Sequence, residues 1–337
     1  MSRRAVSPPS ATDPRAAAAA RFRDDLIRAL GGASAAPVLL AVSGGPDSMA
    51  MLTLAAGALP GGVAVATVDH GLRADAAVEA AMVARHCAAL GVDHATLVPA
   101  EPIAGASIQA QARAARYALL AQEARRIGAV AVATAHHADD QAETFLMRAA
   151  RGSGLAGLAG VRARTRIDGV TMVRPLLDWR RAELRAIVRG GGVPFVDDPT
   201  NHDPAHDRTR FRALLVANEW LGAAQLARSA AALSEADADI RAIVDWLWDA
   251  RATEQEGAVH LDIAGLPREI VRRLARRAIG IVRATERIDT PAWSDAVNIE
   301  PLLDALAAGK RATQAGIIVT PLASGWRFAR APARRSH

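Results

Sequence analysis

Over its first 150 residues the chain alternates short apolar runs with longer segments of mixed polarity. Four runs have the length and β-branched content of buried strands, and these are Val38–Val42, Val63–Val68, Ala95–Val98 and Val130–Thr134. The segments between them carry apolar residues at helical spacing, at 47–57, 74–90, 107–127 and 138–150. Strands that alternate with helices predict an α/β fold, a doubly wound parallel sheet with helices on both faces.

The pattern changes beyond residue 150. A glycine-rich loop at 152–160 precedes a strand-like piece at Thr171–Leu176 and a helix that starts near Arg180. Beyond residue 222 the pattern is mostly helical, until Gly316–Pro321 and Trp326–Phe328 predict a terminal hairpin. We therefore expect a flexible tail over 1–20, an α/β domain over 21–218, and a smaller, mostly helical C-terminal domain over 219–337.

Polar clusters follow three of the predicted strands, at the point where each strand ends. Ser43-Gly44-Gly45 follows the first strand, Asp69-His70-Gly71-Leu72-Arg73 the second, and His136-His137-Ala138-Asp139-Asp140 the fourth. In parallel sheets, ligands bind beyond the carboxyl ends of the strands. The three clusters are therefore expected to converge on one crevice.

The first cluster has the features of a phosphate site. Ser43-Gly44-Gly45-Pro46-Asp47-Ser48 joins a strand to a helix start, where unpaired backbone N–H groups and the helix dipole favour an anion. A kinase-type P-loop needs Gly-Lys-Ser/Thr, but the only lysine of the chain is Lys310, and the dinucleotide fingerprint Gly-x-Gly-x-x-Gly is absent. The alternative is a plain glycine turn.

Carboxylates stand beside the expected phosphate site. Asp47 cannot neutralise phosphate, so it is a candidate ligand of Mg²⁺, or alternatively a helix cap. Asp139 and Glu143 are four residues apart and share a helix face with Asp140 nearby. Three acids without a nearby base repel one another, which predicts a metal ion or an amine between them.

The composition and charge of the chain limit the cellular compartment and the classes of binding partner that we expect. The 337 residues carry a net charge of +6, and one cysteine, Cys87, excludes a disulfide framework or a multi-cysteine metal site and indicates the cytoplasm. No apolar run is long enough to span a membrane. Nine arginines lie between Arg151 and Arg189 against three acids, and a second cluster holds Arg272, Arg273, Arg276 and Arg277. These clusters predict contact with nucleic acid, or alternatively a solvated helix face.

The assembled motifs resemble those of one family. Ser-Gly-Gly-x-Asp-Ser is the phosphate loop of the PP-loop ATP pyrophosphatases, which cleave ATP between its α and β phosphates. Within that superfamily, residues 35–218 resemble the tRNA(Ile)-lysidine synthases, in a compact form. The segments that carry the resemblance are Ser43–Ser48, Asp69–Arg73, Ala112–Tyr117, His136–Thr144, Arg148–Gly152, Arg174–Leu177 and Asp198–Asn201.

The resemblance implies a reaction. ATP adenylates the C2 oxygen of the wobble cytidine in an isoleucine tRNA with a CAU anticodon, and pyrophosphate leaves. The ε-amine of free L-lysine then attacks C2 and expels AMP, which gives lysidine. ATP as substrate, Mg²⁺, the tRNA and lysine are the implied ligands, while the sequence leaves the oligomeric state open.

Roles for individual residues follow from the motifs and the resemblance together. ATP is expected on Ser43, Gly44, Gly45, Pro46, Asp47, Ser48, His70 and Arg113, with Asp47 also the metal ligand. The expected catalytic residues are Asp47, Asp139, Asp140 and His136, and the substrate lysine is expected on Asp139 and Glu143. Arg73, Arg151 and Arg174 are expected to contact tRNA. The resemblance also implies that residues 21–218 form the ATP-binding catalytic domain and that the C-terminal domain, 219–337, binds tRNA.

For several of these residues a purely structural role is the alternative to catalysis or ligand binding. His136 and His137 could cap the helix or fill the strand end, and His70 could simply end a strand. Arg113 could stack on Tyr117 instead of binding phosphate.

Other reactions fit less well. A tRNA thiolase, the alternative within the superfamily, needs paired or clustered cysteines, and only Cys87 is present. GMP or asparagine synthetases need a glutaminase with an N-terminal nucleophilic cysteine, which this chain lacks. A non-catalytic nucleotide- or RNA-binding module would not need Asp47, Asp139 and Asp140.

Overall fold

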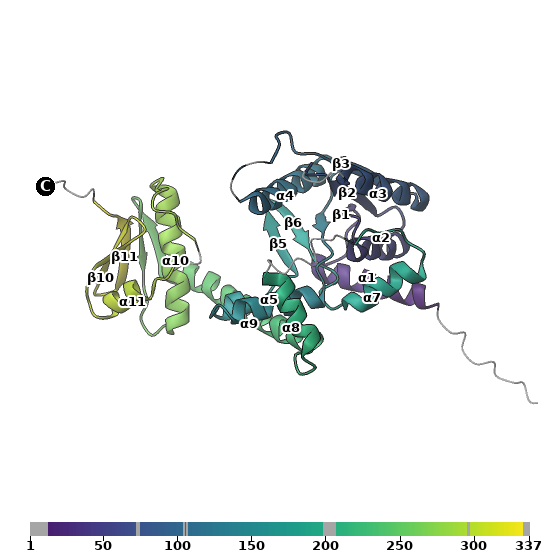
Figure 1. The fold of residues 1–337 in the computed structure, drawn as a ribbon. Helices are drawn as coiled ribbons and strands as arrows, with labels where there is room; N and C mark the ends of the chain where they lie inside the picture. Colours follow the sequence, from purple (N-terminus) through teal and green to yellow (C-terminus); the bar gives the residue numbers. More distant parts are fainter. Residues whose placement is uncertain are drawn as a thin grey trace, which may run out of the picture. The chain divides into compact units, whose positions relative to one another are not determined.

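The computed structural model describes residues 13–71, 75–103, 105, 107–197, 207–294 and 297–332 (Figure 1). The chain forms two compact units, one that ends at Ser234 and one that begins at Glu235. Among the described residues, no helix is both long enough and apolar enough to cross a membrane.

The first unit is built on a six-stranded sheet in the order β3-β2-β1-β4-β6-β5. All neighbours are parallel except β5, which pairs antiparallel with β6 at the edge. The predicted parallel sheet is therefore confirmed, but β5 is a strand that the sequence pattern missed because its residues alternate with arginine. The strands are β1 Val38–Ala41, β2 Val63–Val68, β3 Asp93–Leu97, β4 Ala131–Ala133, β5 Arg164–Ile167 and β6 Val170–Val173.

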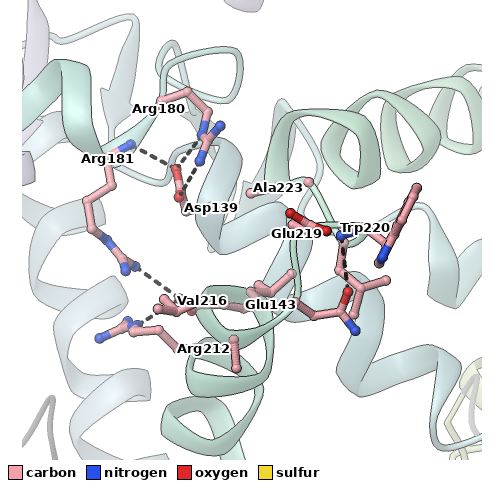
Figure 2. Close-up of a pocket in the computed structure, with 14 residues that line it drawn as sticks. Asp139, Glu143, Arg180, Arg181, Arg212, Val216, Glu219, Trp220 and Ala223 are labelled. Atoms are coloured by element: carbon pink, nitrogen blue, oxygen red, sulfur yellow. Dashed lines mark hydrogen bonds and ion pairs between the residues drawn. The ribbon is translucent and has the colours of Figure 1, made fainter.

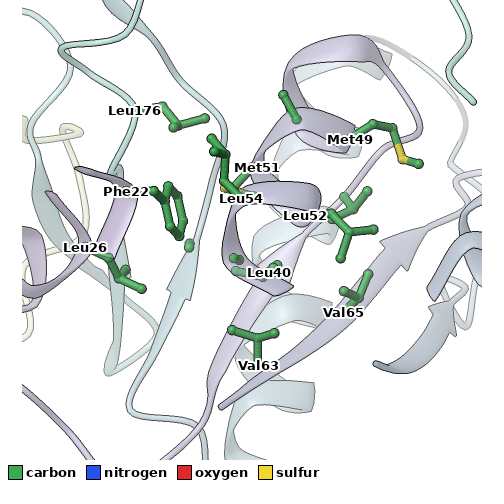
Figure 3. Packing of buried hydrophobic residues seen from close by; sticks show 14 of the residues in the cluster. Phe22, Leu26, Leu40, Met49, Met51, Leu52, Leu54, Val63, Val65 and Leu176 are labelled. Carbon is green, nitrogen blue, oxygen red and sulfur yellow. The ribbon is translucent and has the colours of Figure 1, made fainter. Parts of the chain in front are cut away.

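Helices cover both faces of this sheet, as predicted. Leu40 belongs to a core that includes Phe22 and Leu54 (Figure 3). The adjacent Leu39 packs into a second core with Leu120. Successive residues of a strand point to opposite faces, so β1 contributes to both cores. The helices are α1 Pro14–Leu30, α2 Pro46–Ala58, α3 Ala76–Leu90, α4 Ile108–Arg126, α5 Ala138–Ala149, α6 Leu155–Leu158, α7 Arg181–Gly190 and α8 Asp207–Ala217.

The first helix corrects one prediction. Residues 14–20 are not a frayed tail but the first turns of α1. Asp13 caps this helix by accepting a hydrogen bond from the backbone N–H of Arg15, Pro14 occupies its first position, and alanines follow. Alanine has the highest helix propensity, and the buried Phe22 and Leu26 hold α1 against the core.

The second unit is the expected helical C-terminal region, but it also contains strands that the sequence pattern did not predict outside the terminal hairpin. A five-stranded antiparallel sheet in the order β7-β8-β11-β10-β9 stands beside α10 and α11. The expected hairpin is present as β10 and β11, and Leu322 pairs with Gly325 at its turn. The elements are β7 Ala252–Gln255, β8 Ala258–Leu261, α10 Arg268–Thr285, α11 Glu300–Ala307, β9 Ala312–Gln314, β10 Ile317–Leu322 and β11 Gly325–Arg330.

The border between the units lies later than the expected 218–222. Helix α9, Ala223–Arg251, runs through the border without interruption. Its first part belongs to the first unit because it contacts residues there, for example where Arg162 donates to Ser234 Oγ at 3.1 Å. A continuous helix has no local sequence signal at the point where its packing partner changes.

Candidate active site

The loop between β1 and α2 forms the expected anion site. Gly44 has a φ of +86°, which favours glycine, and Gly45 is the N-cap of α2. Ser48 Oγ accepts from Ser43 N–H at 3.2 Å and donates to Gly45 O at 2.9 Å. The Ser48 hydroxyl thus fixes the shape of the loop, and the first N–H groups of α2 are left for a ligand.

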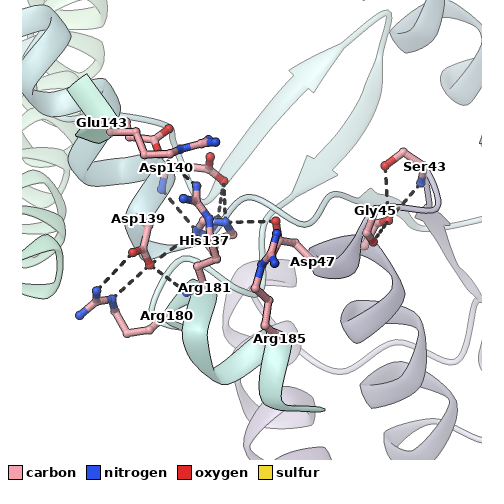
Figure 4. A network of polar contacts seen from close by, with 12 residues as sticks. Ser43, Gly45, Asp47, His137, Asp139, Asp140, Glu143, Arg180, Arg181 and Arg185 are labelled. Atoms are coloured by element: carbon pink, nitrogen blue, oxygen red, sulfur yellow. Dashed lines mark hydrogen bonds and ion pairs between the residues drawn. The ribbon is translucent and has the colours of Figure 1, made fainter. Parts of the chain in front are cut away.

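His137 joins this loop to α5 (Figure 4). Its side chain is 1% exposed, and its Nε2 lies 3.4 Å from Asp47 Oδ2 and 3.6 Å from Asp140 Oδ2. Its Nδ1 accepts from Asp140 N–H at 3.3 Å, so His137 also caps α5. A ring whose Nδ1 accepts carries its proton on Nε2, and that N–H faces both carboxylates.

Both carboxylates influence the protonation of His137, and His137 influences that of Asp140. Burial alone lowers the pKa of His137, but Asp140 and Asp47 outweigh it and raise the pKa above its usual value. Burial alone raises the pKa of Asp140, but His137 and Arg208 pull it below its usual range. Asp140 is therefore ionised at neutral pH.

Arginines surround the other two acids of α5. Asp139 accepts from Arg180 at 3.1 and 3.2 Å and from the backbone N–H of Arg181 at 2.8 Å. Glu143 is 1% exposed and pairs with Arg181 at 3.0 Å, Arg208 at 3.0 Å and Arg212 at 2.8 Å. The premise that these acids have no base nearby is wrong, because the chain itself supplies arginines beside Asp139 and Glu143. The binding of the substrate lysine by Asp139 and Glu143 stays a prediction.

His136 lies beside a second group of basic residues. Its Nδ1 is 2.9 Å from Thr134 Oγ1, and its pKa is lowered to about 4, mainly by burial. Asp140 opposes this lowering, while Arg174, Arg208 and Arg113 contribute to it. His136 is therefore neutral at pH 7, a state in which the ring can donate or accept a hydrogen bond but carries no charge.

The end of β2 contributes His70 to the same region. Burial lowers the pKa of His70, Arg116 lowers it further and Asp69 opposes both. His70 Nδ1 is buried without a hydrogen-bond partner, which leaves it open to a ligand. Arg113 lies over the Tyr117 ring at 5.0 Å and is exposed, so it can stack and still reach an anion.

The arginines expected to contact tRNA fall in different environments. Arg174 is 5% exposed and donates to Arg162 O at 2.6 Å, so the prediction of a surface contact with tRNA is wrong for this residue. Arg151 is exposed and pairs with Asp207 at 2.6 Å. Arg73 and the turn at 198–201 lie outside the described residues.

The second arginine cluster lies on α10, with Pro267 as its N-cap. Arg272 pairs with Glu300 at 2.5 Å, Arg273 with Asp237 at 2.7 Å, and Arg277 with Asp245 at 2.7 Å. Acids of the same unit thus offset much of the positive charge that suggested a nucleic-acid surface.

Sequence reasoning missed several residues of the site. The helix cap expected of His137 is confirmed, but its contact with Asp47 was not predicted, and the arginines of α7 and α8 were not connected with the acids of α5. The signal for His137 is its position three residues before Asp140, which is the spacing of a capping box. The pairing of Arg181, Arg208 and Arg212 with Glu143 depends on helix packing, which the sequence pattern does not show.

A cavity of about 710 Å³ opens beside the arginine–carboxylate cluster (Figure 2). Asp139, Glu143, Arg180, Arg181 and Arg212 form one side of it. Its remaining lining comes from the end of α8 and the turn that leads into α9, namely Leu215, Val216, Ala217, Asn218, Glu219, Trp220, Leu221, Gly222 and Ala223. The cavity volume is within the range of small-molecule sites.

Asp47 has the features of a ligand for a divalent cation. Its Oδ1 is buried without a hydrogen-bond partner, while its Oδ2 faces His137. A buried, unpaired carboxylate oxygen at a phosphate loop suits Mg²⁺. Within the described part of the chain, no group of three or more acid, histidine or cysteine side chains is arranged to hold a metal ion. Oxygens of the nucleotide would have to complete the coordination.

The fold, the loop and the acids define a PP-loop enzyme, and residues 18–219 match the PP-loop domain family. The chain is 45% identical to the tRNA(Ile)-lysidine synthase of Novosphingobium aromaticivorans over 95% of each chain. It is 41% identical to the tRNA(Ile)-lysidine synthase of Zymomonas mobilis, over 88% of this chain and 89% of that one. The chain belongs to the tRNA(Ile)-lysidine synthase family.

A solved structure supports the fold alone. The U34-tRNA thiolase NcsA from Methanococcus maripaludis, with its [4Fe-4S] cluster, superposes with a TM-score of 0.55 at 15% sequence identity. The superposition covers 66% of this chain and 80% of that one. The thiolase alternative has no support in the residues here, because Cys87, the only cysteine of the sequence, is buried and burial raises the pKa of its thiol to about 11.

Proposed function

We propose that this protein converts the wobble cytidine of a CAU-anticodon isoleucine tRNA to lysidine, with ATP and free L-lysine as co-substrates. Membership of the family and the convergence of Asp47, His137 and Asp140 at the phosphate loop support this proposal. The substrates also indicate the cytoplasm, where unmodified tRNA, ATP and lysine are available.

The first step is adenylation. The C2 oxygen of cytidine attacks the α-phosphorus of ATP, and pyrophosphate leaves. The backbone N–H groups at the start of α2 bind the departing phosphates, since a helix N-terminus stabilises negative charge. Asp47 would hold Mg²⁺ through Oδ1, and the ion would neutralise phosphate charge.

A further group of basic residues suits the α-phosphate of ATP. Arg113, on α4, is exposed, and His136 and His70 are neutral hydrogen-bonding groups at two strand ends. We assign these three residues to the nucleotide. The buried Arg174 contributes its positive charge to this group. Its guanidinium donates to a backbone carbonyl and to Thr165, and its charge lowers the pKa of His136.

The second step is attack by lysine. The ε-amine attacks C2, the bond to the adenylate oxygen breaks, and AMP leaves. Asp139 already accepts three hydrogen bonds from Arg180 and Arg181, whereas within the described part of the chain Asp140 Oδ1 has one ion-pair contact, with Arg208 at 3.9 Å. We therefore assign Asp140 to the substrate ammonium, which must lose a proton because its ordinary pKa is about 10.4.

The test is product analysis with purified protein, ATP, Mg²⁺, isotopically labelled lysine and the unmodified tRNA. Lysine on C2 of the wobble cytidine, found by mass analysis of the nucleosides, is the expected result. Asp47→Asn should lower the rate at least about 100-fold, whereas Asp24→Asn, at an exposed acid of α1, should not. Cleavage of ATP to AMP without transfer of lysine would contradict the proposal.

A further inference from the structure

The cavity beside the arginine–carboxylate cluster has two chemically different sides. Asp139, Glu143, Arg180 and Arg212 make one side polar. The other side is the segment 215–223, which presents the apolar Val216 and Trp220 together with Asn218 and Glu219 (Figure 2). The reaction proposed above uses the first side, through the neighbouring Asp140, and leaves the side that carries Trp220 without a role.

Trp220 and Val216 are unusually exposed for apolar residues. Trp220 is 87% exposed and Val216 is 84% exposed. Each large apolar group left in water forgoes a favourable burial free energy of about 25 cal/mol per Å². Exposed apolar side chains at the rim of a cavity are typical of a ligand surface.

The turn that carries Trp220 has a defined conformation. The backbone N–H of Trp220 donates to Asn218 Oδ1 at 3.1 Å, and the N–H of Leu221 donates to Asn218 O at 3.1 Å. The start of α9 follows at Ala223. The indole is therefore presented from a fixed turn, which reduces the entropy lost when a ligand binds to it.

We propose that Trp220 is a stacking platform for an unpaired nucleobase of the tRNA anticodon loop, beside the reacting cytidine. The inference rests on the proposed function and names the part of the RNA that this side of the cavity contacts. Bases of single-stranded RNA loops are available for stacking on aromatic rings, and tryptophan offers the largest face.

The charged residues at this surface favour a nucleotide over a protein as its ligand. Arg180 is 41% exposed at the cavity although it pairs with Asp139, and its guanidinium can still reach a phosphate. A planar apolar face beside an accessible guanidinium group matches a base and its phosphate, whereas a protein partner would need a wider apolar area.

The experiment measures the dissociation constant of fluorescently labelled, unmodified CAU-anticodon isoleucine tRNA with the full-length protein, without ATP or lysine. Trp220→Ala should weaken binding by roughly 5- to 150-fold, the equivalent of one base–aromatic stack. Trp220→Phe keeps an aromatic face and should retain most of the affinity. The melting temperature should be unchanged in both variants, because the side chain is exposed.

Trp246 provides a matched control. It is 69% exposed on α9 but belongs to the second unit and does not line this cavity. Trp246→Ala should leave the dissociation constant unchanged. Equal weakening by both alanine variants would overturn the specific role of Trp220.

Two other outcomes would also overturn the inference. Unchanged tRNA affinity in Trp220→Ala would exclude stacking, and a raised KM for lysine in that variant would assign the surface to the amino acid instead. Failure of the proposed function is recognised separately, because the wild-type protein would then not bind this tRNA in preference to an unrelated one.

Discussion

The two units both concentrate arginines and acids, but they do so in different environments. In the first unit the arginines converge on Glu143, which is almost completely buried at the strand ends of a parallel sheet. On the surface of α10 in the second unit, Arg268 meets Glu300 and Asp304, and all three are substantially exposed. Similar ion pairs therefore have different consequences, because a buried charge depends on its partners and an exposed charge can turn to water.

The largest effect on stability is expected at the buried cluster. Glu143→Gln removes the charge that three arginines share, and we expect a loss of about 3–5 kcal/mol in the free energy of unfolding. Urea unfolding of the variant and of Glu101→Gln, at an exposed acid of the same unit, would measure it. Equal stability of the two variants would show that the cluster behaves like the α10 surface.

The next effect depends on pH and arises at His136. Its pKa in the folded protein is about 4, below the ordinary 6.5, so between these values the unfolded state binds more protons. Stability should therefore fall as the pH falls from about 6.5 to about 4, by about 3 kcal/mol from this residue. His136→Gln should remove that part of the pH dependence, and unfolding curves of both proteins at pH 7 and pH 4.5 would check it. An unchanged dependence would place the cause elsewhere.

A smaller effect separates the two contacts of His137. Asparagine at this position can still cap α5 through an oxygen near the Nδ1 position, but it cannot reach Asp47 as Nε2 does. Glutamine keeps the reach toward Asp47 and caps less well. We expect His137→Asn to keep the melting temperature and to lose roughly 10- to 100-fold in kcat, with little change in KM for ATP.

His137→Gln is the matched variant for this prediction. It should lose about 1 kcal/mol of stability with the cap and retain more of the rate. If His137 only caps the helix, the order of the rates would be reversed, with the asparagine variant the more active of the two.

The smallest effect is expected on α10. Arg268→Ala removes contacts with Glu300 and Asp304 at an exposed site, and we expect a change of no more than about 1 kcal/mol in the free energy of unfolding. The pKa of Glu300 is held at about 2 mainly by its hydrogen bond with Arg272, with Arg268 adding to it, so one partner remains in the variant. A loss as large as that of Glu143→Gln would remove the contrast between the two units.

How far the sequence predicted the fold and the site depended on whether the signal was local. The phosphate loop was recognisable because a strand, two glycines and a helix start are consecutive at 38–49. The parallel sheet was predictable because strands and helices alternate. By contrast, β5 and β7 were missed because short polar edge strands have no apolar pattern, and the arginine partners of Glu143 were missed because they come from 38 to 69 residues further along the chain.

The sequence by itself determined the class of chemistry. It placed Asp47 at the phosphate loop and Asp139, Asp140 and Glu143 on one helix turn, since those relations follow from spacing alone. Only the tertiary structure decided which acid is available. Packing of α7 and α8 against α5 brings guanidinium groups to Asp139 and Glu143, and strand order brings His137 between Asp47 and Asp140. The physical reason is that a charge acquires its protonation state and its partners from neighbours in space, and burial makes those neighbours decisive.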